Sequence, residues 1–334
     1  MTDHKNRWVN GLDSLRFILA LVVMLSHLHD PVRDVTRHSG SVILRFVGIL
    51  SGHVFPGVVA VSAFFLISGF VIHFTSKDQP RFDMASFLVR RWVRVGLPLA
   101  LLLLLSHYFG RFILAMVWSL YAELIYYTLY PLLRRLRFSW KVKMVMGTSL
   151  SLLAVCLLLG AGAGWIRIGG LGFRSITWQM LIAMVNLPIW MAGILMAERY
   201  DSRRTVAPVR VWLVRGALYV VAMVIVFIRM RYSISTIYTC LAITPLLYLW
   251  LDAEIAYYHT HKASKMLEWC GRFSYSLYLW HLLALQLLSC TMKLTVYTYP
   301  VYIVLSVVFA YVAYLLIERP AHMLARRLAK VVSA

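Results

Sequence analysis

The sequence contains little charge, and acidic residues are especially scarce. Only 14% of its 334 residues are charged, with 13 Asp and Glu against 34 Lys and Arg, while 61% are hydrophobic. A soluble domain averages about a quarter charged residues and about half apolar ones. The composition therefore excludes an ordinary soluble domain and predicts an all-α integral membrane protein.

Cysteine is also scarce. The chain has four, which fall in or beside apolar runs without a paired spacing: Cys156, Cys240, Cys270 and Cys290. We interpret them as packing residues rather than as a disulfide or metal framework. The first apolar run lacks a small-residue cleavage site, which favours a retained span over a removed signal peptide.

The net charge of +21 would point to nucleic acid in a soluble protein. Here the basic residues lie in short connections between apolar runs, and no basic helix with interleaved aromatic residues or known nucleic-acid motif occurs. We therefore expect the lipid bilayer, and not a nucleic acid, to be the partner that this charge serves.

Ten apolar runs are long enough to span a bilayer. They lie near residues 12–29, 56–75, 92–109, 112–133, 142–162, 176–197, 210–228, 234–251, 273–292 and 300–318. The third and fourth are joined only by about Gly110 and Arg111. The polar stretch 30–55 has room for a short surface helix and a loop. No soluble domain is left over, so residues 1–334 are predicted to form one membrane domain.

Most Lys and Arg residues fall in the connections on one side of these ten runs, the side that also holds both ends of the chain. The positive-inside rule then predicts cytoplasmic termini.

Two ionisable residues share the first apolar run. Arg16 and His27 are eleven residues apart, which on a straight helix is roughly 16 Å, about half the hydrocarbon thickness. Ionisable groups in a lipid-embedded segment are costly and mark functional sites by default. A cation near one membrane face and an imidazole deeper in the bilayer suit a long anionic donor with a reactive far end.

Six local patterns occur in order between residue 11 and about residue 320. They are GLDSLR at 11–16, running on to His27; GV at 57–58 with FFLISGFVI at 64–72; RRWVR at 90–94; WSLYAE at 118–123; SYSLYLWH at 274–281; and ERP at 318–320. Together they resemble the acyltransferase family 3 of membrane O-acyltransferases.

The resemblance implies transfer of an acyl group, usually acetyl from acetyl-CoA, to a sugar hydroxyl. The expected acceptors are lipid-linked or envelope glycans of a bacterium, which implies a multi-pass protein of the inner membrane. The acyl-CoA is a donor substrate; no metal and no permanently bound cofactor is implied. A succinyl donor and a non-sugar acceptor stay open as alternatives.

The resemblance also assigns roles to residues. The donor phosphates are expected at Arg16, Arg90, Arg91 and Arg94. The catalytic residues are expected to be His27, as the base that deprotonates the acceptor hydroxyl, with Glu123 and His281 orienting it or the sugar. The substrate pocket is expected to contain Ser68, Gly69, Trp118, Ser119 and Tyr278.

Each role has a structural alternative. Without Arg16 and the surrounding pattern, His27 would be interpreted as an ordinary helix histidine. The Arg cluster at 90–94 also suits positive-inside anchoring, although Arg91 and Arg94 share a helix face and guanidinium forks match phosphate geometry. Glu123 suits a structural ion pair equally well.

A transporter is the competing class, since it would also have about ten spans and intramembrane charges. Transporters often consist of two related halves. The spacing of Arg16 and His27 has no counterpart near residues 170–200, which favours the enzyme.

Overall fold

The structure, a computed structural model, describes residues 9–79, 81–109, 117–160, 176–201, 204–232 and 236–333, and within them it is helical without any β-strand. The helices are α1 (Leu12–His27), α2 (Pro31–Arg37), α3 (Val42–Ser51), α4 (Gly57–Ser76), α5 (Met84–Phe109), α6 (Trp118–Arg135), α7 (Trp140–Gly160), α8 (Ile176–Glu198), α9 (Pro208–Tyr232), α10 (Thr236–Tyr258), α11 (Lys265–Gly271), α12 (Ser274–Thr291), α13 (Tyr299–Ala313), the π-helix η2 (Tyr314–Glu318) and α14 (Arg319–Val332). The prediction of an all-α protein is confirmed.

Each of the ten predicted spans contains a helix, and six helical stretches among the described residues are long and apolar enough to cross a membrane. These six are Leu12–Arg37, Gly57–Ser76, Trp140–Leu157, Met180–Glu198, Pro208–Arg229 and Tyr299–Val332. Helices α5, α6, α10 and α12 are not among them. All four are rich in polar side chains, and α5 and α6 each have three charged ones. The predicted connection at Gly110 and Arg111 lies outside the described residues.

Helices α4 and α8 pack closely at the centre of the protein. Gly69 of α4 lies against the carbonyl group of Trp190, and Gly193 of α8 lies against that of Leu66. A Cβ atom on either glycine would collide with the backbone of the other helix. Two small residues facing each other across the contact therefore set the separation of α4 and α8.

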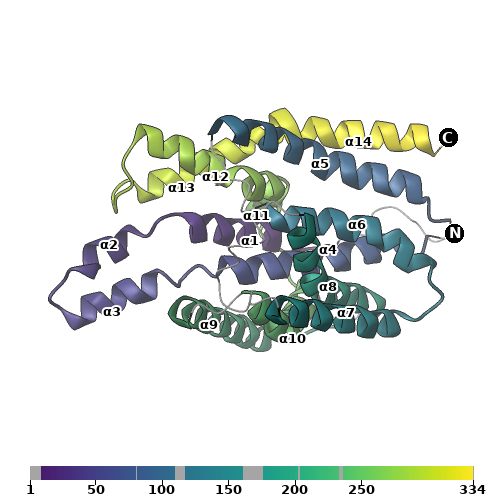
Figure 1. The fold of residues 1–334 in the computed structure, drawn as a ribbon, viewed down its shortest axis with the longest axis horizontal. Coiled ribbons are helices and arrows are strands. Elements are labelled where there is room, and N and C mark those ends of the chain that lie inside the picture. The colour runs from purple at the N-terminus through teal and green to yellow at the C-terminus, as the bar shows by residue number, and fades with distance from the viewer. Residues whose placement is uncertain are drawn as a thin grey trace.

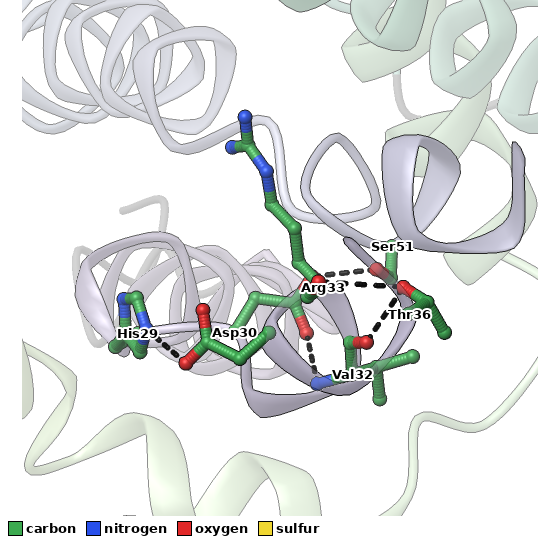
Figure 2. Close-up of polar contacts among 7 residues, drawn as sticks. His29, Asp30, Val32, Arg33, Thr36 and Ser51 are labelled. Carbon is green, nitrogen blue, oxygen red and sulfur yellow. Dashed lines mark hydrogen bonds and ion pairs between the residues drawn. The ribbon is translucent and has the colours of Figure 1, made fainter. Parts of the chain in front are cut away.

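Residues 30–55 form two helices, α2 and α3, where one surface helix and a loop were predicted. The pair projects from the end of α1, away from the rest of the protein (Figure 1). Asp30 caps α2 by accepting a hydrogen bond from the Val32 amide, and its second carboxylate oxygen accepts one from the Ser51 hydroxyl on α3 (Figure 2). Gly48 lies directly against Thr36, so the two helices form a close hairpin.

Helix α3 presents most of its apolar side chains outward. Val42, Ile43 and Phe46 are 70, 74 and 58% exposed. The first helix of the hairpin begins with Pro31 at a position where its missing amide hydrogen costs nothing.

Helices α13, η2 and α14 form one long continuous helix. The candidate span Tyr299–Val332 has 34 residues, or roughly 51 Å of α-helix against a hydrocarbon core of about 30 Å. Figure 1 shows α14 lying beside α5 along one edge of the molecule. The helix is therefore long enough for the basic end of α14 to pass beyond the bilayer.

Three of the four cysteines have described side chains, and they are free: Cys156, Cys270 and Cys290. Burial raises the pKa of the Cys270 thiol above its usual value, which keeps it protonated and unreactive at neutral pH. Cys270 therefore agrees with the prediction that the cysteines are packing residues, whereas Cys156 and Cys290 are exposed.

Candidate active site

A cavity of about 400 Å³ lies among α1, α4, α5, α6, α11–α12, η2 and α14. Its polar lining consists of Asp13, Arg16, Arg91, Arg94, Ser119, Glu123, Tyr127, Arg272, Ser274, Tyr275, Tyr278, Tyr314, Glu318, His322 and Arg326. Its apolar lining includes Val61, Phe64 and Phe65 of α4. Residues from both ends of the chain thus meet at one site.

Three of the four predicted donor-binding arginines line this cavity. Arg91 and Arg94 are three residues apart on α5 and face it together, and Arg16 reaches it from α1. Arg16 also lies 3.7 Å from the carboxylate of Asp13. Arg90 is exposed and does not line the cavity. Because α5 begins at Met84, all of these α5 arginines lie inside the helix rather than before it.

Most of the guanidinium groups in the cavity lack a carboxylate partner. Within the described part of the chain, no carboxylate oxygen lies within 4.0 Å of Arg91, Arg94, Arg272 or Arg326. The guanidinium of Arg91 lies 5.6 Å from the ring centre of Phe87 and 5.5 Å from that of Tyr127. The cavity also contains the carboxyl groups of Asp13, Glu123 and Glu318. Guanidinium groups that have no carboxylate within ion-pair distance can still bind a further anion directly.

Glu123 lies on the α6 wall and is held by hydroxyl groups. It accepts hydrogen bonds from Tyr127, one helical turn away, and from Ser68 of α4 at 3.3 Å. No ion pair to Glu123 occurs among the described residues. The carboxylate is therefore a hydrogen-bonded wall of the cavity and not half of a structural ion pair.

The hydroxyl groups of Ser119 and Tyr278, two residues of the cavity lining, form a hydrogen bond with each other. The ring of Tyr278 also contacts Phe64 edge-on, with ring centres 5.7 Å apart. One turn further along α12 is His281, whose ring centre lies 6.2 Å from that of Tyr278. Tyr278 therefore stands between the cavity and the two predicted histidines.

His27 and His281 form a hydrogen-bonded pair outside the cavity lining. Their rings stack with centres 5.1 Å apart, and His27 Nδ1 lies 3.1 Å from His281 Nε2. His281 Nδ1 lies 2.7 Å from the carbonyl oxygen of Tyr278, which can only accept a hydrogen bond. In the neutral pair, His281 thus holds its proton on Nδ1, and His27 donates from Nδ1. The lone pair that remains free is on His27 Nε2.

Three predicted pocket residues do not line the cavity. Ser68 touches it only through its hydrogen bond to Glu123. Gly69 faces Trp190 of α8 and does not line the cavity. Trp118 packs edge-on against Phe65, with ring centres 6.1 Å apart.

Several lining residues were not assigned to the site from sequence. Glu318, the first residue of the ERP pattern, is one of them. It lines the cavity, and its hydrogen-bond partner is the hydroxyl of Ser276 at 2.6 Å. His322 and Arg326 are four residues apart on α14, and this spacing places both on one face of the helix. The sequence could therefore have indicated that they act together. Nothing in the sequence showed which neighbour that face meets.

Fold and site together define a helical membrane protein with a cationic internal cavity next to a histidine pair. The family model described as an acyltransferase domain matches residues 9–315. The chain therefore belongs to acyltransferase family 3 and is a membrane acyltransferase. Searches among curated proteins and among solved structures matched nothing.

Proposed function

We propose that the protein transfers an acetyl group from acetyl-CoA to a sugar hydroxyl of an envelope glycan, at the inner membrane of a bacterium. The observation that carries this proposal is the arrangement of two sites in series. Guanidinium groups without carboxylate partners line a cavity, and a hydrogen-bonded histidine pair lies next to the lining residue Tyr278. A long donor with phosphates at one end and a thioester at the other matches that arrangement.

The donor would enter from the cytoplasm with its phosphates on Arg91 and Arg94. Guanidinium groups bind phosphates through paired, charge-assisted hydrogen bonds. Arg16 extends the same set of cations on α1. The pantetheine arm would then run along Phe64 toward Tyr278, the lining residue next to the histidine pair.

The proton chemistry follows from the tautomers of the histidine pair. His27 Nε2 takes the proton of the acceptor hydroxyl while the hydroxyl oxygen attacks the thioester carbon. The carbon–sulfur bond then breaks, the new ester leaves with the glycan, and the proton passes from His27 to the departing thiolate. Throughout the reaction, His281 Nε2 accepts a hydrogen bond from His27 Nδ1. This bond orients the His27 ring and stabilises protonated His27.

The position of His27 also suits an acceptor from the opposite membrane face. It is the last residue of α1, roughly 16 Å along the helix from Arg16. We propose cytoplasmic termini on the positive-inside rule. A cysteine at Ser139 should then resist a membrane-impermeant thiol reagent in intact cells, whereas one at Ser39, beside the α2–α3 hairpin, should react.

Purified protein with radiolabelled acetyl-CoA and an acceptor glycan tests the chemistry, with His27→Ala as the decisive variant. We expect donor binding to be kept, because it depends on the arginines, and the rate to fall about 10²–10⁴-fold, the usual range for a positioned acid–base group. His29→Ala is the matched control. His29 is two residues away, is exposed, and pairs with Asp34 at 2.7 Å, so its loss should cost little.

Initial-rate kinetics should give intersecting double-reciprocal lines, as a ternary complex requires. Parallel lines, or label trapped on His27 without acceptor, would replace the base with a covalent intermediate. Full activity of His27→Ala would remove the residue from catalysis. Preference for succinyl-CoA would change the acyl group, and solute transport without acyl transfer would refute the proposal as a whole. Mass spectrometry of envelope glycans from cells with and without the gene would then identify the acceptor.

A further inference from the structure

Helix α14 follows the part of the chain that matches the family model, yet it forms one wall of the cavity. The match ends at residue 315, whereas α14 spans Arg319–Val332 and contributes His322 and Arg326 to the lining. These two residues are four apart and so project from the same side of the helix. The helix lies beside α5, which carries Arg91 and Arg94 (Figure 1).

The five arginines that line the cavity fall into two groups by exposure: Arg16, Arg91 and Arg94 are half-buried, whereas Arg272 and Arg326 are exposed. Arg91 and Arg94 are half-buried on α5, and Arg91 stands against Tyr127, which is itself bonded to Glu123 in the interior. Arg326 is exposed at the rim, with His322 one turn away and half-buried. A ligand that contacted both groups would need two anionic parts, one at the half-buried arginines and one at the exposed ones.

An acyl-CoA donor has that distribution of charge. Its diphosphate lies in line with the pantetheine arm, and its ribose 3′-phosphate branches off beside the adenine. The phosphates together carry about four negative charges near neutral pH. The guanidinium groups of the cavity that have no carboxylate oxygen within 4.0 Å among the described residues are Arg91, Arg94, Arg272 and Arg326, and each can bind a donor phosphate.

We propose that His322 and Arg326 form a subsite for the ribose 3′-phosphate of the donor, separate from the diphosphate subsite on Arg91 and Arg94. The inference rests on the proposed use of acyl-CoA and adds to it a reason for discrimination between related donors. The competing role for a basic helix is attachment to anionic lipid. Arg327 separates the two, because it is a neighbouring, exposed arginine on α14 that does not line the cavity.

The experiment compares acetyl-CoA with 3′-dephospho-acetyl-CoA as donors for the wild-type protein, Arg326→Gln and Arg327→Gln. Loss of one charge-assisted phosphate contact should raise the KM for acetyl-CoA roughly 10- to 100-fold in Arg326→Gln. The KM for the dephospho donor and kcat should change little, because the 3′-phosphate is remote from the thioester. Arg327→Gln should behave as wild type with both donors, and Arg326→Lys should recover part of the loss.

Displacement of bound acetyl-CoA gives a readout that does not depend on turnover. Adenosine 3′,5′-bisphosphate should compete much better than adenosine 5′-monophosphate against the wild-type protein, and equally poorly against Arg326→Gln. Equal use of the two donors by the wild-type protein, or equal effects of Arg326→Gln and Arg327→Gln, would overturn the subsite in favour of a lipid-binding helix. Failure of every variant, the wild-type protein included, to bind or use either donor would instead refute the proposed function and the subsite with it.

Discussion

Arginines inside the helical bundle have two opposite environments. On α9, Arg215 donates from Nε and Nη2 to the carboxylate of Glu254 on α10, at 2.7 and 2.8 Å, and the Trp250 indole adds a third hydrogen bond at 3.0 Å. On α5, Arg91 and Arg94 face a cavity and have no carboxylate partner within the described residues. The guanidinium charge of Arg215 is neutralised by a carboxylate on the neighbouring helix, whereas those of Arg91 and Arg94 have no such partner among the described residues.

The contrast separates architecture from ligand binding. Glu254 is 1% exposed and has its acceptors occupied, so the α9–α10 pair joins two helices and leaves no room for a third group. The α5 pair has no carboxylate oxygen within 4.0 Å among the described residues, so a ligand that enters the cavity can bind it directly. An arginine within a membrane helix therefore does not by itself indicate a binding site; the absence of a partner does.

Removal of the positive charges of Arg91 and Arg94 should have the largest effect. In Arg91→Gln/Arg94→Gln, two charge-assisted contacts are lost, each worth about 1.5–3 kcal/mol, so acetyl-CoA binding should weaken by about two to four orders of magnitude in equilibrium titration. The stability of the fold should not fall. Lys at both positions should restore only part, since an ammonium lacks the guanidinium fork.

Arg90→Gln is the control, because it removes the same charge from an exposed position on the same helix. Normal donor binding by the double Gln variant would show that the cluster only anchors α5 in the membrane.

Disruption of the Arg215–Glu254 ion pair should have the opposite result: a loss of stability without a loss of donor binding. Glu254→Gln leaves Arg215 without its counter-charge and should lower the free energy of unfolding by about 3 kcal/mol, the lower end for a buried pair, because the Arg215 side chain is 27% exposed. Donor binding should be unchanged. Chemical unfolding in detergent measures the loss.

Arg215→Met with Glu254→Leu removes both charges and should recover most of the stability. A donor-binding defect in Glu254→Gln without loss of stability would contradict the division between the two regions.

Close packing of α4 and α8 should be the next most sensitive feature. Gly193→Ala places a Cβ against the backbone of α4 and should cost about 1–3 kcal/mol of stability. Gly216→Ala on α9 is the matched control, since a Cβ there meets nothing within 4 Å; it should be neutral or slightly stabilising. Thermal unfolding of the two variants side by side gives the comparison.

The hydrogen bond between Ser119 and Tyr278 in the cavity lining should matter least for stability. Ser119→Ala removes it and should cost about 0.5–1.5 kcal/mol. Tyr278→Phe removes the same bond, so the double variant should lose less than the two single variants added together. Additive losses would mean that the two hydroxyls act independently.

Much of the fold could be predicted from the sequence, because a membrane helix needs a long apolar run and each predicted run is a helix in the structure. The prediction missed features that depend on shorter or mixed segments. The second helix of the 30–55 stretch needs Asp30 and Ser51 to meet across 21 residues. Helix α14 alternates Ala and Leu with Arg, Lys and His, so no apolar run marked it.

The site was predictable where its signal lies along one helix. The spacing of Arg91 and Arg94 shows a shared face, and both line the cavity. The contribution of Arg326 and the hydrogen bond between His27 and His281 depend on which helices become neighbours. Periodicity fixes the orientation of a residue about its own axis and carries no information on the helix it meets. The exclusion of Gly69 from the cavity has the same cause.

The α2–α3 hairpin has a consequence for the order of folding. Its hydrogen bonds join residues no more than 21 positions apart, so the loop-closure entropy that precedes them is small. Short-range structure of this kind forms early. We expect the hairpin to fold as soon as it has been translocated across the membrane, before α8 has been synthesised. It would then act as a short, preformed connector that fixes how far α1, with His27 at its end, can lie from α4.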